Sequence, residues 1–422
     1  MQPRSVRTMV SSDSRSSLRL RWALAALLPL LLLLHGVEAM SLHGHVGSDY
    51  RIFYDSVRRL LADPATLYAP DARESLQGYL YPPPAALLFL PLLLGSVEQG
   101  FAIASAVIVG CGVLSCLMWL SLTREALGLR RDWLAALVIV ALATSTGAML
   151  AVRQGQVGTI ILFLCVAAVW LDSRGWPKLA GALIAAGCWI KIYPVLMLFW
   201  LFCRPQWRPM LTGFVIAAVG IPLVALVKVP PALYLDYFQT QLPAMSGRAI
   251  VHIDNQSIAA IVTRLDLPLE VYSLSYQTAP LPGWLRGGVV LAMLGAMTAI
   301  MLRVRRTGAP ALTVASWAPA IACLVAPLGW GHTYVLLFPL FVQLCRVSLA
   351  RIEAGEGWGE AVAIGLCYLA LLPPGYHRLA IAEMLPGWAA QLFYARYAVA
   401  ALVLLAISWR QLGREGKAAR PA

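Results

Sequence analysis

The types of three ionisable side chains in this 422-residue chain suggest a chemistry. They are Asp49, Lys191 and His332. A carboxylate can act as a general base that takes a proton from a hydroxyl group. Fixed cations stabilise a leaving phosphate as its negative charge grows. Together, these residue types suit the transfer of a group from a phosphate to a hydroxyl.

Each of these residues also has a purely structural interpretation. Ser48 suits a helix N-cap, and a carboxylate at Asp49 would then lie in the first turn, where the helix dipole favours it. Lys191 could extend its stem to an interface. His332 could simply open a helix after the break at Pro327. The sequence alone leaves both interpretations open.

Further polar side chains form short clusters between the apolar runs. Gln156 and Asn255 can hydrogen-bond to hydroxyl or phosphate groups, whereas Arg153 is equally explained as an interfacial anchor. The triplet Asn255-Gln256-Ser257 is equally explained as the cap of a loop helix. The candidates for substrate binding in these clusters are Tyr81, Arg153, Gln156, Asn255, Gln256 and Arg264.

The composition identifies the surroundings of this chain as a lipid bilayer. Hydrophobic residues make up 60% of it and charged residues 13%, about half of the roughly 25% found in water-soluble domains. Apolar runs of about 16–22 residues recur between Trp22 and Trp409, and each can cross a hydrocarbon core of about 30 Å. The sequence therefore predicts an all-α polytopic membrane protein.

Charge and cysteine usage exclude other classes. The net charge of +13 comes from basic residues in short loops and tails, which is the positive-inside pattern of membrane proteins. No basic stripe is interleaved with aromatic residues, so nucleic-acid binding is excluded. The eight cysteines lie in or beside apolar runs, without CxxC pairs or suitably spaced histidines. We therefore expect neither a metal site nor a disulfide framework.

Loop charges predict the topology. The basic tails 1–21 and 410–422 are expected in the cytoplasm, and residues 22–409 form one membrane domain. The first helix brings the loop 41–79 to the outer face, as would a signal peptide cleaved after Val37-Glu38-Ala39. The ten expected crossings are about 22–40, 101–121, 133–151, 155–171, 209–228, 285–302, 309–326, 331–346, 358–373 and 394–409.

Two further segments are broken, which gives a count of ten to thirteen helices. Residues 80–95 contain four prolines and predict a partial or strongly tilted helix. Residues 179–202 lie between two basic inner loops, which predicts that they enter and leave the membrane on the same side. Their split at Lys191-Ile192-Tyr193-Pro194 predicts two half-helices that meet near Lys191, where irregular backbone requires a polar cavity.

An amphipathic stretch begins at Asp49 in the first outer loop. The apolar residues Phe53, Val57, Leu60 and Leu61 follow helical spacing. We expect this helix to lie in the outer membrane interface. With this topology, Asp49 and the polar clusters face the same outer side, and Lys191 can join them from its half-helix.

The polar clusters follow one another along the chain in an order that resembles glycosyltransferase family 87 of the GT-C superfamily. This family includes polyprenyl-phosphate-dependent mannosyltransferases. The resemblance runs from about residue 45 to 345. It is carried by Asp49-Tyr50 with Tyr54 and Leu67-Tyr68, Tyr81-Pro82-Pro83, Gly155-Gln156, Gly181 with Lys191 and Pro194, Asn255-Gln256-Ser257 with Arg264, and Trp330 with His332. Val157 departs from the family, which often has a polar residue there.

The resemblance implies a GT-C-like bundle in the cell (inner) membrane. It also implies transfer of a hexose, mannose by family, from a polyprenyl-phosphate sugar on the non-cytoplasmic face. Asp49 occupies the position of the catalytic base, and transfer with inversion needs one such base. The lipid-linked sugar is the implied co-substrate, without a cofactor or metal, and the acceptor is a glycolipid, a glycan or a protein.

Two other observations bear on the choice of function. The hydropathy and broken helices also suit a secondary transporter or a lipid flippase, although transporters often show two related halves and none is visible here. The outer loops contain no Asp-x-Asp pair, which argues against a metal-bridged diphosphate donor. A membrane glycosyltransferase is therefore the favoured interpretation.

Overall fold

The computed structural model describes residues 47–68, 78–127, 133–265, 267–268, 271, 277–372 and 378–418. These residues are mainly helical, apart from loops and two four-residue strands, β1 (Arg248–Val251) and β2 (Gln277–Pro280). The all-α membrane fold is thereby confirmed. The tail 1–21 and the expected first helix at 22–40 lie outside the described residues.

The first half of the fold runs from α2 to α11 and contains Asp49, Tyr81, Gln156 and Lys191. Its elements, with short 3-10 or π turns labelled η, are α2 (Ser48–Ala62), η1 (Pro64–Thr66), α4 (Ala85–Leu88), η2 (Leu90–Leu94), α5 (Val97–Leu127), α6 (Trp133–Thr144), α7 (Thr146–Gln154), α8 (Gly158–Ser173), α9 (Pro177–Ile190), η3 (Tyr193–Leu196), α10 (Met197–Leu201) and α11 (Trp207–Ala225). Residues 80–95 form the short α4 and η2, as their prolines predict.

The second half continues with a loop region and a further set of helices. Its elements are α12 (Pro231–Asp236), η4 (Tyr237–Gln241), α13 (Leu242–Gly247), β1, α14 (Ile258–Arg264), β2, α16 (Gly283–Thr307), α17 (Leu312–Val325), η5 (Gly331–Leu337), α18 (Phe338–Glu353), α19 (Trp358–Ala370), α20 (Arg378–Glu383), α21 (Gly387–Tyr394) and α22 (Arg396–Ala418). The strands pair antiparallel, with Arg248 opposite Pro280.

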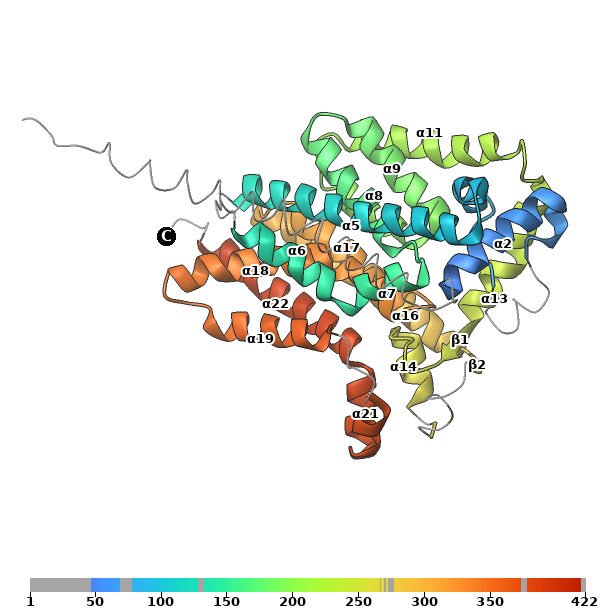
Figure 1. Ribbon diagram of the computed structural model, residues 1–422. Coiled ribbons are helices and arrows are strands. Elements are labelled where there is room, and N and C mark those ends of the chain that lie inside the picture. The colour runs from blue at the N-terminus through green and yellow to red at the C-terminus, as the bar shows by residue number, and fades with distance from the viewer. Residues whose placement is uncertain are drawn as a thin grey trace, which may run out of the picture.

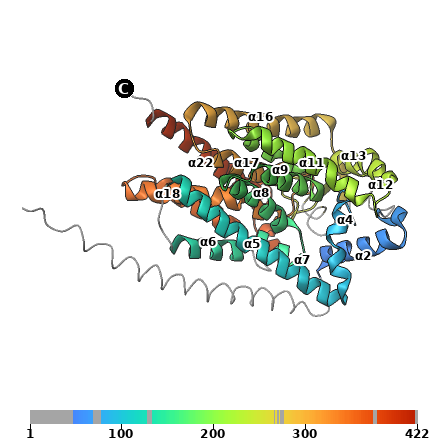
Figure 2. The ribbon, with the colours of Figure 1, turned by 90° about the horizontal axis from the view of Figure 1, so that it is seen from above.

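The long helices run in broadly one direction (Figure 1). In both ribbon views, α2 and α13 lie at one end of the bundle and the C-terminal end of α22 lies at the other (Figures 1 and 2). By length and composition, four described helices can cross a bilayer: Val97–Thr123, Trp207–Ala225, Gly283–Thr307 and Gly331–Ile352. Two bent pairs, α7 with α8 and α21 with α22, raise this number to six.

The described residues hold fewer continuous spans than the ten to thirteen expected helices. The expected helix 22–40 lies outside the described residues, and turns divide several other apolar runs. The expected helix 133–151 breaks at Ser145, whose side chain caps α7 by accepting a hydrogen bond from the Ala148 N–H. Three further apolar helices, α9, α17 and α19, have only 10–17 residues. Each is shorter than the ~20 residues of an untilted span.

Residues 179–202 fold as the predicted pair of half-helices. The helix α9 ends at Ile190, Lys191 is extended, and η3 and α10 continue the chain. The Arg204 Nε lies 2.6 Å from the Asp172 Oδ2, and Asp172 belongs to the last turn of α8, just before α9. The two ends of the segment therefore meet, and Lys191 lies at the far tip of a hairpin.

The hairpin is fixed in the bundle by close contact between α9 and α11. A Cβ added at Gly181 would lie 1.8 Å from the Met210 carbonyl oxygen, and one added at Gly213 would lie 1.8 Å from the Lys178 carbonyl oxygen. Small residues let helix backbones approach in this way in membranes. The position of Lys191 thus depends on two glycines that touch neighbouring backbone.

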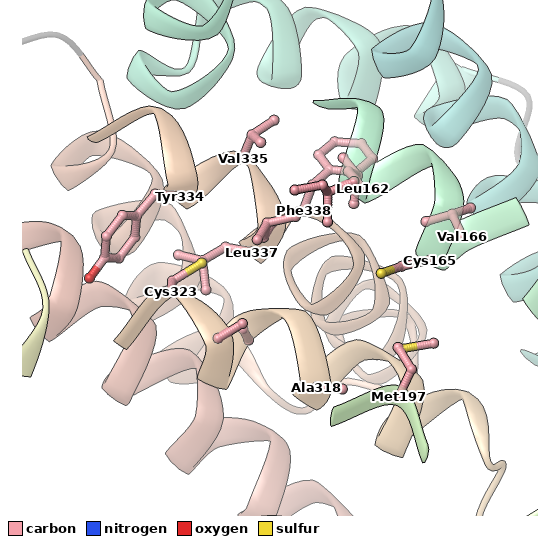
Figure 3. Close-up of a cluster of buried hydrophobic side chains, with 14 of the residues drawn as sticks. Leu162, Cys165, Val166, Met197, Ala318, Cys323, Tyr334, Val335, Leu337 and Phe338 are labelled. Carbon is pink, nitrogen blue, oxygen red and sulfur yellow. The ribbon is translucent and has the colours of Figure 1, made fainter. Parts of the chain in front are cut away.

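Apolar side chains fill the interior between α8, α10, α17 and η5 (Figure 3). Leu162, Met197 and Leu337 are each almost fully buried. Cys165 and Cys323 lie among them as small apolar residues, and both are free thiols. This core supports η5, the segment that carries His332.

Candidate active site

The candidate active site begins with the first turn of α2. The N-cap of this helix is Gly47, without a side-chain cap, so the expectation that Ser48 caps the helix is wrong. The Ser48 hydroxyl instead lies 3.4 Å from the Asp49 Oδ1. Asp49 lies in the first turn, as predicted, and its carboxylate is directed to side chains of other elements.

The apolar face of α2 packs against protein. Phe53, Val57 and Leu60 are buried, whereas Leu61 is 46% exposed. The Phe53 ring stacks on Phe89, with centroids 4.3 Å apart, and meets Tyr81 edge-on at 5.0 Å. These aromatic contacts bring the loop after Gly78 to the same place as Asp49.

Gly155 permits the contact between α2 and the turn from α7 to α8. Its φ of +71° favours glycine, and a Cβ would lie 2.5 Å from the Tyr50 Cβ. The helices α7 and α8 are bent by 118° relative to each other across this turn. The next residue, Gln156, is thereby directed toward Asp49.

Gln156 joins Asp49 to Tyr81 through hydrogen bonds. Its Nε2 donates to the Asp49 Oδ2, and its Oε1 accepts from the Tyr81 hydroxyl at 3.2 Å. The glutamine side chain is buried. Since a carboxylate only accepts and the tyrosine hydroxyl can donate, this orientation of the amide satisfies both partners.

Lys191 supplies positive charge to this group. Its Nζ lies 5.2 Å from the centre of the Tyr81 ring and 6.0 Å from that of Tyr193. Burial raises the pKa of the Asp49 carboxyl above its usual value, while the Gln156 hydrogen bond and the charge of Lys191 oppose this rise. The structure therefore brings together Asp49, Gln156, Tyr81 and Lys191.

His332 lies close to the same group, at the start of η5. Its side chain is buried, and Nδ1 lies 3.1 Å from the Gln154 Oε1 at the end of α7. With that oxygen as acceptor, Nδ1 carries the proton and Nε2 is left as an acceptor. Among the described residues, Nε2 has no hydrogen-bond partner. Gln154 stands two residues before Gln156, so its contact with Nδ1 brings His332 near the group around Asp49.

Asn255, Gln256 and Arg264 form a separate cluster that binds backbone groups. Arg264 is fully buried, and it donates to the carbonyl oxygens of His252 and Asn255, each at 2.8 Å, and of Tyr394 at 3.2 Å. The Gln256 amide donates to the Ile253 and Tyr394 oxygens and accepts from the Tyr397 N–H. These hydrogen bonds hold loops together, and binding of donor phosphate by this cluster stays a prediction.

This cluster supports the segment that leads to His332. The Asn255 Oδ1 accepts from the Gly329 N–H at 3.0 Å, and its Nδ2 donates to the Pro327 carbonyl at 3.2 Å. Asn255 also pairs with Trp330 as an isolated antiparallel bridge. Because His332 follows two residues later, Asn255 positions it through the backbone.

Arg153 and Gln154 are the last two residues of α7. Arg153 is exposed in the last turn of that helix, and no contact places it with Asp49. The contact of Gln154 with His332 was not foreseen, although Gln154 stands inside the Arg153-Gln154-Gly155-Gln156 cluster. Its signal was a polar side chain beside a glycine at a break between apolar runs.

Comparison with known proteins gives two findings. The family profile described as Glycosyltransferase family 87 matches residues 79–327, which is more than half of the chain. The chain is also 27% identical over 362 residues to the polyprenol-phosphate-mannose-dependent alpha-(1-2)-phosphatidylinositol mannoside mannosyltransferase of Mycobacterium tuberculosis (strain ATCC 25618 / H37Rv). That alignment covers 80% of this chain and 79% of the relative.

Proposed function

The chain belongs to glycosyltransferase family 87, and from this premise we propose that it transfers a hexose from a polyprenyl-phosphate sugar to an acceptor hydroxyl with inversion. The relative named above, which depends on polyprenol-phosphate mannose, supports mannose as the sugar. We place the reaction on the non-cytoplasmic face of the cell (inner) membrane, with both termini in the cytoplasm. The loop charges support this orientation.

The observation that carries the proposal is the meeting of the half-buried Asp49, Tyr81 and Lys191 around the buried Gln156. The acceptor oxygen attacks the sugar C1 while the bond from C1 to the phosphate oxygen breaks. The acceptor proton passes to the Asp49 carboxylate, and the bonding electrons leave with the phosphate. A single displacement of this kind inverts the configuration at C1.

The other residues hold the donor in this proposal. Lys191 stabilises the leaving phosphate with a charge that is fixed at the hairpin tip. The free Nε2 of His332 suits a sugar hydroxyl while the ring is neutral, and the phosphate when it is protonated. Arg264, Asn255 and Gln256 serve mainly by holding the segment before His332, and exposed Arg153 is the candidate nearest to bulk solvent or lipid headgroups.

The acceptor and co-substrates follow the same reasoning. A phosphatidylinositol mannoside is the acceptor in the relative's name, so a glycolipid is the first acceptor to test, before a glycan or a protein. The proposal uses the lipid-linked sugar as co-substrate and needs no further cofactor. A lipid donor also accounts for a site that is built among membrane helices.

Asp49→Asn tests the proposal directly. We expect this variant to lose roughly 10²–10⁴-fold in transfer rate, because general base catalysis contributes about that factor. The measurement is transfer of labelled mannose from polyprenyl-phosphate mannose to lipid extracts, with the variant in membranes. The anomeric configuration of the product reports inversion.

Asp55→Asn is the matched control, since Asp55 is an exposed carboxylate on the same helix. It should transfer sugar like the wild type. Equal rates for Asp49→Asn and the wild type would refute the base assignment. If the wild type never consumes the lipid-linked sugar, the donor class is wrong.

A further inference from the structure

Two short helices next to the candidate active site expose a stripe of large apolar side chains. Its members lie on α20, on the turn after α20 and on α21. Its members are Ile381 (40% exposed), Met384 (85%), Trp388 (72%) and Leu392 (53%). A group of exposed large apolar side chains on neighbouring short helices marks an interaction surface.

The opposite side of these helices is covered by protein. Ala382, Ala390 and Tyr394 form a small apolar core with Val251 of β1 and Ile253. Gln391 adds a hydrogen bond from its Nε2 to the Arg264 carbonyl oxygen at 3.3 Å. Because this side fixes the two helices to the loop region, the exposed stripe faces away from the loop region.

The direction of α21 is that of a helix lying across the bundle. It bends by 69° from α22, which together with it meets the length and apolarity of a membrane span. Figure 1 shows α21 leaving the body across the direction of the long helices. If α22 is close to the membrane normal, α21 lies close to the membrane plane.

The bend itself carries the residues that favour the headgroup layer. The Arg396 guanidinium lies 5.0 Å from the Phe393 ring centre and 4.4 Å from that of Tyr397. It also donates to the Tyr397 hydroxyl at 2.8 Å. Arginine and amphipathic aromatic residues anchor membrane proteins at this depth, where phosphate groups and water meet hydrocarbon.

We propose that α20 and α21 form an interfacial anchor whose Ile381, Met384, Trp388 and Leu392 side chains insert into phospholipid at the end of the bundle that carries Asp49. Hydrogen bonds connect the anchor to the residues that support the site. The Tyr394 carbonyl at its base accepts hydrogen bonds from Gln256 and Arg264, which belong to the cluster that supports His332. The inference does not depend on the sugar transferred.

Photocrosslinking of the full chain tests the anchor. A photoreactive phenylalanine analogue replaces Trp388 or Met384, and the protein is reconstituted in vesicles of phosphatidylcholine and phosphatidylglycerol. The matched comparison position is Glu383, an exposed charged residue of α20 beside the stripe. After irradiation, mass spectrometry counts phospholipid adducts on the peptide that contains each position.

The expected result is several-fold more phospholipid adduct at positions 388 and 384 than at 383. Since both stripe residues are more than two-thirds exposed, the replacement leaves the core intact. Crosslinks to a second copy of the chain would overturn the proposal in favour of a protein interface. Products with water alone, in protein that still transfers sugar or keeps its thermal unfolding temperature, would overturn it as well.

Discussion

Gln156 is the residue through which Tyr81 acts on Asp49. The Tyr81 hydroxyl donates to the Oε1, and the amide is thereby turned so that its Nε2 donates to the carboxylate. The tyrosine hydroxyl bonds to the amide rather than to the carboxylate, so its expected effect is one of positioning. This chain of contacts gives the catalytic aspartate of the proposal a defined orientation.

Gln156→Leu should move the pH dependence of transfer. Asp49 acts as a base only when ionised, so activity falls as the pH drops through its pKa. The Gln156 hydrogen bond lowers that pKa against the effect of burial. Without the hydrogen bond the pKa rises, and the acid limb of kcat/KM shifts to higher pH. Rates measured between about pH 4 and 9 cover the carboxyl titration.

Tyr81→Phe offers a graded comparison, because it removes only the donor that orients the amide. Its acid limb should move in the same direction by a smaller amount. A uniform loss of rate in both variants, with the acid limb unmoved, would show that the two residues merely support the fold.

Lys191 permits a second test at this scale. Lys191→Met should lower kcat by roughly 10²–10³-fold, the usual cost of removing one group that stabilises developing charge. Lys191→Arg should restore part of the loss, since it keeps the charge with a different shape. Lys178→Met, at an exposed position next to the other end of α9, is the control and should be unaffected. A wild-type kcat for Lys191→Met would show that the lysine does not stabilise the leaving phosphate.

The site residues differ in how far the sequence could assign them. Lys191 could be singled out because a charge amid apolar residues requires a partner, and Asp49 because a carboxylate can act as a general base. The structure joins them through Gln156 and Tyr81. Arg264 could not be distinguished from a phosphate ligand in the same way. Its fully buried guanidinium binds backbone carbonyls, and the sequence does not show where those oxygens will lie.

At the scale of elements, the contact between α9 and α11 sets the position of the hairpin tip. Gly181→Ala should destabilise the protein by about 1–3 kcal/mol, the usual cost of forcing extra volume into a packed interior. The added methyl group would overlap the Met210 carbonyl, so the two helices must separate. Thermal unfolding in detergent or nanodiscs measures the loss.

Gly220→Ala is the matched control in α11. A Cβ at that position meets nothing within 4 Å, so the change should be neutral or slightly stabilising through helix propensity. Equal unfolding temperatures for the Gly181 and Gly220 variants would contradict the close contact between the helices.

The elements themselves were predictable where hydrophobic runs are long and charges mark their ends. The broken character of 80–95 and 179–202 followed from proline and from basic loops on both sides, and both are confirmed. The strands β1 and β2 have four residues each and no long alternating pattern, so they were missed. The spacing of apolar residues shows that α2 has a face that must be covered. It does not show whether lipid or protein covers that face, and in the structure the Phe89 ring packs there.

For the whole molecule, the loop charges predict opposite faces for the two ends of the bundle. Arg58→Cys on α2 and Lys178→Cys in the first turn of α9 both introduce thiols at exposed positions. In intact cells, a membrane-impermeant maleimide should label the first variant and leave the second unlabelled until the membrane is opened. The native cysteines are buried or half-buried, and the wild type gives the background. The reverse pattern would place the candidate active site on the cytoplasmic face.

The ion pair of Asp172 with Arg204 bears on how a ribosome delivers this chain to the membrane. Residues 177–201 return to the end of the bundle at which they start, so we expect them to add an even number of passages across the membrane. Every later helix therefore keeps its orientation, whether the hairpin enters the lipid early or late during synthesis. Burying a lysine in lipid without partners is costly. With late entry, Lys191 would stay at the translocon and enter the lipid only when it can contact the rings of Tyr81 and Tyr193.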